Sequence, residues 1–319
     1  MRFFALPFLG RLLHTLAVLF LVSVGTVLLL DLMPGDPAAV MLGESATPDR
    51  VAALREQLGL EDSFFERYTH WVNGLLHGDM GSSIVTGRPV FDDIIGRLQV
   101  TLELAVLATL LAIVVSVPAA VYCAFRTDRL FDRAWTTATS LFVSVPGFVA
   151  GVVLAYVLAV QLHALPLLGW VPLGDSLSGN LRTAALPVLA LSLAEIAVFS
   201  RVLRADLIST LQEDFVVTAK AKGLHPAYIL FRHALRPSTL PLMTLSGLSL
   251  ARIIGGTVVI ESIFSLPGLG QLVITSVTTS DVPVVQGVVI TAAAAYVLVN
   301  ALTDAAYTIV DPRTRVRVS

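Results

Sequence analysis

Residues 100–123 read VTLELAVLATLLAIVVSVPAAVYC and contain a single charged side chain, Glu103. A helix of about 20 apolar residues is long enough to cross the hydrocarbon core of a bilayer. Backbone groups that face lipid must be hydrogen-bonded within the protein, and a helix achieves this inside one segment. The stretch therefore predicts a transmembrane helix, and it suggests that a bilayer organises the whole fold.

The composition of the chain supports this interpretation. The 319 residues are 55% hydrophobic and 14% charged, with a mean hydropathy of +0.82, whereas soluble domains carry about 25% charged residues. We predict an all-α membrane protein, a single transmembrane domain over 1–319 with six spans at Leu9–Leu30, Val100–Cys123, Trp135–Val160, Ala184–Val202, Leu240–Ile260 and Val284–Val310. The first run exceeds the roughly 7–15 residues of a signal-peptide core and precedes no A-x-A site, so we expect an uncleaved span.

The positions of Lys and Arg predict the orientation, because these residues concentrate in cytoplasmic loops. With a cytoplasmic N-terminus, the inner segments hold 14 of the 21 cationic residues and the outer segments hold 6, while Arg252 lies inside a span. Both termini and the segment 205–237 are then cytoplasmic. Segment 31–97 is extracytoplasmic.

The outer segment 31–97 is too long for a simple turn and predicts two helices. Thr47-Pro48 is typical of a helix start, and a second stretch spaces Phe64, Tyr68, Trp71 and Leu75 as one helical stripe. The stripe is either buried within a small cap or forms a docking surface for an external partner, and the two interpretations are compatible.

Several chemistries lack the residues that they need. The phosphate-binding loop G-x-x-x-x-G-K-[ST] is absent, because the chain's two lysines, Lys220 and Lys222, are followed by Ala and Gly. The six histidines form no H-E-x-x-H motif, and Cys123 is the single cysteine. We therefore expect no metal site, no cofactor bound by this chain and no enzymatic activity. The net charge of −2 gives no indication of a nucleic-acid partner.

Both lysines lie in EDFVVTAKAKGLHPAYILFRHALRP, residues 213–237. The sequence predicts one helix from Asp206 to Lys222 that stops at Gly223, since glycine is suited to the left-handed position after a helix end. A second helix is expected to begin with His225 near the cap and Pro226 at the first position. The segment is either an ordinary charged loop or a surface that a partner recognises.

At these residues the chain resembles the permeases of binding-protein-dependent ABC importers, whose conserved cytoplasmic loop matches VVTAKAKGL followed by FRHALRP. More narrowly, it resembles the B-type permease of dipeptide and oligopeptide importers, with nickel permeases among the relatives. The likeness runs nearly end to end through MPGDP (33–37), LGL (58–60), HGDMGSS (77–83), TLELA (101–105), SVPGF (144–148), ESIFSLPGLGQL (261–272), DVPVVQG (281–287) and VDPRTR (310–315).

The resemblance implies a type I ABC importer permease that carries peptides across a bacterial plasma membrane. It implies a second homologous permease, two ATPase subunits (or one fused ATPase) that bind ATP and Mg, and an external solute-binding lipoprotein. The loop would dock on the ATPase through Ala219, Ala221 and Gly223 as a close-packing core, with Thr218, Lys220, Lys222, Arg232 and His233 around it. Two positions depart from the family pattern: Val217 replaces an acidic residue, as in peptide-type relatives, and Pro237 replaces an asparagine.

Two charges fall at similar depth in neighbouring predicted spans, Glu195 and Arg252. Intramembrane charges are rare and usually face a partner or a cavity. We hypothesise that they pair, either to order the packing or to line a route for a zwitterionic peptide. Pro146 predicts a kink in the third span that opens a cavity or aids packing. Glu261, Pro267 and Gly268 are assigned to an outer loop, which either dips toward the translocation path or lies under the external partner.

Other functions remain open at this point. Related cargo would be a nickel chelate or a haem-like compound. A self-contained secondary transporter predicts internal inverted repeats, and none is apparent. A membrane-embedded enzyme would need a metal or nucleophile constellation, which the sequence lacks.

Overall fold

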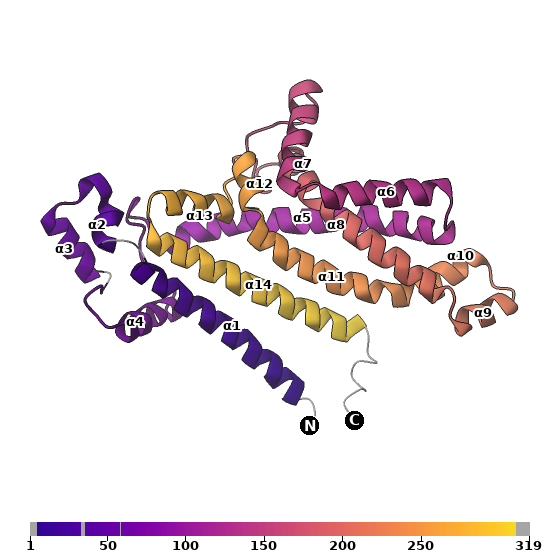
Figure 1. The fold of residues 1–319 in the computed structure, drawn as a ribbon, viewed down its shortest axis with the longest axis horizontal. Helices are drawn as coiled ribbons and strands as arrows, with labels where there is room; N and C mark the ends of the chain where they lie inside the picture. Colours follow the sequence, from indigo (N-terminus) through magenta and orange to yellow (C-terminus); the bar gives the residue numbers. More distant parts are fainter. Residues whose placement is uncertain (1–4, 33–35, 58, 311–319) are drawn as a thin grey trace. The chain divides into compact units, whose positions relative to one another are not determined.

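The computed structural model describes residues 5–32, 36–57 and 59–310, and this part of the chain is almost entirely helical (Figure 1). The predicted all-α fold is confirmed, since the one β-feature in the described residues is an isolated bridge between Ser82 and Pro89. The α-helices are Ala5–Leu32 (α1), Pro37–Leu42 (α2), Pro48–Gln57 (α3), Phe64–Leu76 (α4), Val90–Phe125 (α5), Leu130–Ser144 (α6), Gly147–Leu154 (α7), Leu177–Thr210 (α8), Asp214–Ala221 (α9), Pro226–Tyr228 (α10), Leu235–Gly256 (α11), Val258–Ile263 (α12), Leu269–Thr278 (α13) and Val282–Val310 (α14). Two π-helical segments cover Ala155–Gln161 and Ile229–Ala234, and a 3₁₀ turn covers Gly43–Ser45.

Helices occupy all six predicted spans, but they differ in hydropathy. By length and composition, α5, α8 and the described part of α14 could cross a membrane, and the bent pair of α6 and α7 adds a fourth if it counts as one span. In α1, an apolar helical stretch covers Thr15–Leu28. The sequence of α11 contains Ser, Thr and Gly at several positions, which lowers its hydropathy.

The chain divides into two compact units, and the first combines Met1–Thr101 with Pro267–Val297. In this unit Asp281 joins segments far apart in sequence. Its buried carboxylate accepts hydrogen bonds from the Ser83 hydroxyl at 2.5 Å and the Ile84 amide at 3.2 Å, and such donors offset the cost of burying a charge. The apolar core beside it consists of Val90, Ile94, Leu269, Leu272, Val284 and Val288.

The outer segment of this unit differs from a self-contained cap. The Tyr68 hydroxyl of α4 lies 2.9 Å from the Ser23 hydroxyl of α1, and its ring meets the edge of Phe20 at 6.1 Å between centroids. The predicted stripe on α4 is half-buried and packs on α1, while α2 and α3 bury Ala38, Met41 and Leu54 against Val282. The start of α4 is fixed by a capping box, in which hydrogen bonds from Ser63 hold the pKa of Glu66 below its ordinary value.

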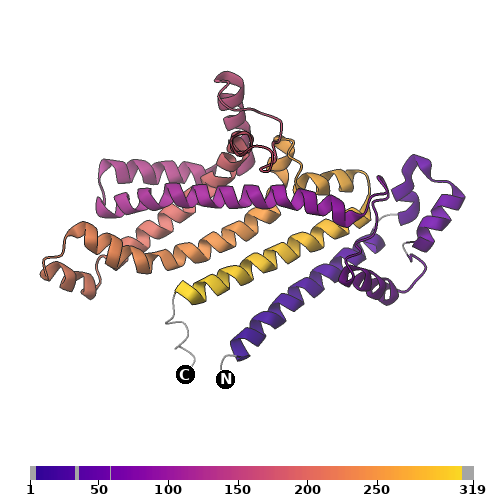
Figure 2. The same ribbon diagram turned by 180° about the vertical axis from the view of Figure 1, so that it is seen from behind.

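The second unit combines Leu102–Leu266 with Leu298–Ser319, and α8 is its central element. This helix packs against α6, α7 and α11 (Figure 1). Seen from behind in Figure 2, α9 and α10 lie together beyond one end of α8. The core on α8 contains Ile196, Phe199, Leu203 and Leu207, which pack with residues of α5 and α11.

Close packing of α11 on the end of α14 depends on Gly247, because an added Cβ there would lie 2.6 Å from Thr303 Cβ. We predict that Gly247→Val lowers the free energy of unfolding by about 1–3 kcal/mol, the usual cost of overpacking a core. Gly255→Val in the same helix is the matched control, since an added Cβ there meets nothing within 4 Å. Thermal unfolding in detergent should separate the two variants. Equal midpoints would contradict the packing role of Gly247.

Candidate functional site

The loop that follows α8 departs from the predicted single helix over 206–222. The central helix α8 ends at Thr210, and α9 begins at Asp214 after a turn in which Glu213 is extended (φ −67°, ψ 149°). Leu211 packs in this turn against the buried residues Val216, Ala219 and Ile229. Burying this apolar cluster requires the chain to fold back, so the continuous helix expected from sequence is wrong.

The end of α9 has the hydrogen bonds of a Schellman motif. The Gly223 amide donates to the Lys220 carbonyl at 2.9 Å, and the Leu224 amide donates to the Ala219 carbonyl at 3.3 Å. Gly223 adopts φ +74°, as the predicted left-handed stop requires. Nothing lies within 4 Å of a Cβ built on Gly223. Backbone conformation, and not space, therefore favours glycine at this position.

The predicted contact residues lie on two faces of α9. Ala219 is buried in the chain's own cluster with Val216 and Ile229. Thr218, Lys220, Ala221, Lys222 and Gly223 are all exposed. Within the group of three small residues, only Ala221 and Gly223 are accessible to a partner in this structure. Ala219 instead holds α9 against the following helix.

The second helix of the loop starts as predicted and then continues into the membrane segment. His225 caps it by accepting a hydrogen bond from the Ala227 amide at 3.3 Å, and Pro226 occupies the first position. A π-helical segment then joins α10 to α11. The predicted contact residue Arg232 is exposed, and His233 is half-buried with its ring 5.5 Å from that of Tyr228.

Large apolar side chains are exposed around these cations. We define the loop face as Lys220, Ala221, Lys222, Gly223 and Arg232 together with the exposed apolar residues Phe215, Val217, Leu224, Tyr228 and Phe231. Phe231 alone is 62% exposed. A contiguous exposed apolar surface with a polar rim is typical of a protein–protein contact. The exposed apolar side chains of the loop face therefore indicate a surface that contacts another protein.

Glu195 of α8 and Arg252 of α11 form an ion pair, with a guanidinium nitrogen 2.5 Å from a carboxylate oxygen. The Ser249 hydroxyl donates to the other carboxylate oxygen at 2.5 Å. The two partners differ in exposure, because the Glu195 side chain is 5% exposed and that of Arg252 is 65% exposed. A buried carboxylate thus anchors a cation that faces outward from the helix pair.

A second ion pair was missed by the sequence analysis. Arg204 of α8 donates to both oxygens of the buried Asp132 in α6, at 2.6 and 2.7 Å. The amide of Asp128 donates to the same carboxylate at 2.9 Å. Bidentate Arg–carboxylate pairs are geometrically specific. This pair fixes the turn before α6 to the last part of α8, from which the loop face projects.

Pro146 marks a stronger break than the predicted kink. It caps α7, and the helix pair is bent by 104°. Gly151 in α7 allows a close approach to α8 and α12, because an added Cβ would lie 3.3 Å from Ile260 and 3.5 Å from Ala190.

The outer-loop assignment of Glu261 needs correction, since the structure places this residue in α12. Its carboxylate is fully buried and accepts a hydrogen bond from the Thr257 hydroxyl at 2.7 Å. A buried carboxylate requires such partners, and a helix supplies one four residues away. Pro267 precedes Gly268, which forms the N-terminal cap of α13.

Comparisons with known proteins identify the family. Residues 116–316 match the family described as binding-protein-dependent transport system inner membrane component, and residues 2–105 match its N-terminal membrane component family. A relative from Sinorhizobium fredii, named a "probable peptide ABC transporter permease protein", is 40% identical over 96% of this chain and 98% of its own length. The glutathione transport system permease protein of Escherichia coli K12 is 34% identical over 96% and 97%.

One solved structure has a similar fold. A chain of the methionine ABC transporter MetNI in an inward-facing conformation superposes with a TM-score of 0.53. It is 16% identical, and the match covers 68% of this chain and 96% of that one. The family match over residues 116–316 includes α8, the loop face and α11. This multi-pass chain belongs to the family of inner membrane components of binding-protein-dependent transport systems.

Proposed function

We propose that this chain is one permease subunit of an ATP-driven importer of short peptides in a bacterial plasma membrane. The observation that carries the proposal is the 40% identity to a peptide permease over 96% of the chain. The exposed loop face supports a mechanical role, because it projects from the end of the central helix α8. A second homologous permease would complete the translocation path, and an external solute-binding lipoprotein would deliver the cargo.

The energy source is proposed to be separate ATPase subunits, two chains or one fused chain, which would hold ATP and Mg. The loop face would dock on them, with Ala221 and Gly223 at the contact and with Lys220, Lys222 and Arg232 around it. Thr218 and His233 belong to the same proposed contact. Small residues allow a partner to approach the backbone closely, and the Schellman turn presents a rigid end of α9.

The docking orientation requires a cytoplasmic loop face, so both termini are proposed to be cytoplasmic. Arg252 is proposed to face the translocation path, where its guanidinium would meet the carboxylate of a zwitterionic peptide. Glu195 holds that guanidinium in place from the buried side, and the Ser249 hydroxyl donates to the other oxygen of the same carboxylate. The bend at Pro146 would shape the same path.

The cargo class is tested by reconstituting the chain with its co-purifying subunits in vesicles. Labelled dipeptides, glutathione and a nickel chelate are offered outside the vesicles together with the solute-binding lipoprotein, and ATP is enclosed inside. We expect ATP-dependent uptake of the peptides. Uptake of the nickel chelate alone would assign the chain to a related importer, and uptake that needs no ATPase would indicate a secondary transporter.

Gly223→Val is predicted to uncouple ATP hydrolysis from uptake while leaving the membrane fold intact. A β-branched residue in the left-handed conformation costs roughly 1–2 kcal/mol, so the Schellman turn opens. Gly223→Asn is the matched control, because asparagine tolerates this conformation. Uptake and ATP hydrolysis measured together should show loss of uptake in the valine variant only. Normal uptake by Gly223→Val would contradict the docking role.

Arg252→Gln is predicted to lower both the yield of folded protein and uptake. The variant leaves the Glu195 carboxylate buried without its cation, at a cost of about 1–3 kcal/mol or more. The double variant Glu195→Gln with Arg252→Gln should restore the yield, because the charge is gone, but should leave uptake impaired. Full recovery of uptake in the double variant would show that the pair serves packing alone.

A further inference from the structure

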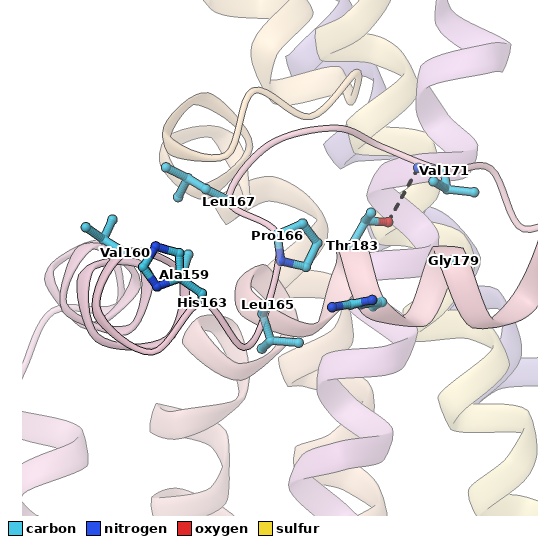
Figure 3. Close-up of a pocket in the computed structure, with 10 residues that line it drawn as sticks. Ala159, Val160, His163, Leu165, Pro166, Leu167, Val171, Gly179 and Thr183 are labelled. Carbon is cyan, nitrogen blue, oxygen red and sulfur yellow. Dashed lines mark hydrogen bonds between the residues drawn. The ribbon is translucent and has the colours of Figure 1, made fainter.

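A groove of about 710 Å³ lies at the end of α8 opposite the loop face (Figure 3). With 34 residues, α8 is about 50 Å long, so the two features are separated by the length of this helix. The groove is lined by Ala159, Val160, His163, Leu165, Pro166, Leu167, Val171, Gly179, Arg182 and Thr183. They come from the π-helical segment after α7, the connection to α8 and the first turns of α8.

The wall formed by the connection is fixed to α8 by hydrogen bonds. The Val171 amide donates to the Thr183 hydroxyl at 3.4 Å, and the Asn180 side-chain amide donates to the Val171 carbonyl at 3.0 Å. Gly179 allows this approach, since an added Cβ would lie 3.1 Å from Val171 Cγ1. The groove is therefore preformed in this unit, and a ligand would not have to order its wall.

The chemistry of the lining is that of an amphiphile site. Most of its side chains are aliphatic, and the exceptions are His163, Arg182 and Thr183. The exposed Arg182 forms no salt bridge with any other residue that the structure describes. No carboxylate lines the groove, so an anionic group could approach the guanidinium without meeting a like charge.

The surroundings of the groove indicate where this amphiphile comes from. Large aliphatic side chains are exposed along the same connection and the start of α8, namely Leu162, Leu168, Leu173, Leu177 and Leu181. The groove also lies where two predicted spans end, at Val160 and Ala184. Arginine side chains near the ends of membrane helices reach the level of the lipid headgroups, where they meet phosphate groups.

His163 adds a local conformational feature. It has φ +49° and lies two residues after the end of the π-helical segment. The chain reverses there through hydrogen bonds from the Ala164 and Leu165 amides to the Leu158 carbonyl. A left-handed conformation is uncommon for a residue other than glycine, and such residues cluster at ligand sites. In Figure 3 the imidazole lies beside Ala159 and Val160 at the edge of the groove.

We propose that this groove binds an anionic phospholipid, with its phosphate at Arg182 and an acyl chain along the aliphatic wall toward His163. Arg182 pairs with phosphate oxygens, for which a guanidinium is geometrically suited. In this arrangement the acyl chain of the lipid contacts Leu165, Pro166 and Leu167. The bound lipid would fill the space between the π-helical segment and α8.

The test is native mass spectrometry of the full-length chain with its co-purifying subunits, incubated with phosphatidylglycerol or with phosphatidylcholine of the same acyl chains. We expect retained phosphatidylglycerol, and an about tenfold loss of it in Arg182→Gln because one charge-assisted contact is removed. Arg182→Lys should keep part of the binding. Arg88→Gln, an exposed cation outside the groove, is the control and should bind like the native chain.

Ala159→Trp tests the acyl-chain part, because an indole would occupy the groove while Arg182 stays in place. It should also lose the lipid. Equal retention of both lipids, or unchanged binding in Arg182→Gln and Ala159→Trp, would overturn the proposal. Displacement of the lipid by inorganic phosphate at millimolar concentration would reduce the site to an anion site and overturn it as well. Absence of phosphatidylglycerol from the native chain in the assembled subunits would overturn the proposal too.

Discussion

A backbone inside a bilayer must satisfy its hydrogen bonds within the protein, and this constraint determines where the chain can carry chemistry. The apolar helices leave unpaired backbone groups and polar side chains mainly at their ends. The loop face is built at such an end, where α8 stops at Thr210 and the chain reverses twice, at Glu213 and at Gly223. Each reversal is held by hydrogen bonds within the chain.

Ion pairs connect α8, from whose end this surface projects, to two neighbouring helices. The pair of Arg204 and Asp132 fixes the last part of α8 to α6, while the pair of Glu195 and Arg252 joins the middle of α8 to α11. A force on α9 would therefore pass to α8 and to the two helices paired with it. In both pairs the carboxylate is buried and the guanidinium is more exposed, which keeps the buried charge compensated.

The sequence predicted features whose signal is local or chemically unusual. The sequence indicates a helix stop at Gly223, because few other residues tolerate the left-handed conformation that ends a helix. It also indicates Glu195 and Arg252, because charges are rare in apolar helices. The break after Thr210 was not predictable, since Leu211 continues the apolar pattern and the reason for the turn is its packing against Ile229. Asp132 and Arg204 gave no signal either, because charges near span ends are common and the two lie far apart in sequence.

We propose that the exposed face of α9 contacts the ATPase and that its buried face does not. Cysteine crosslinking tests it directly, in a Cys123→Ala background that removes the single native thiol. Ala221→Cys is exposed and Ala219→Cys is buried two residues away on the same helix. With a short thiol-directed photo-crosslinker applied to the co-purified complex, we predict a product with the ATPase subunit from position 221 and none from position 219. Equal products from both positions, or none from 221, would contradict it.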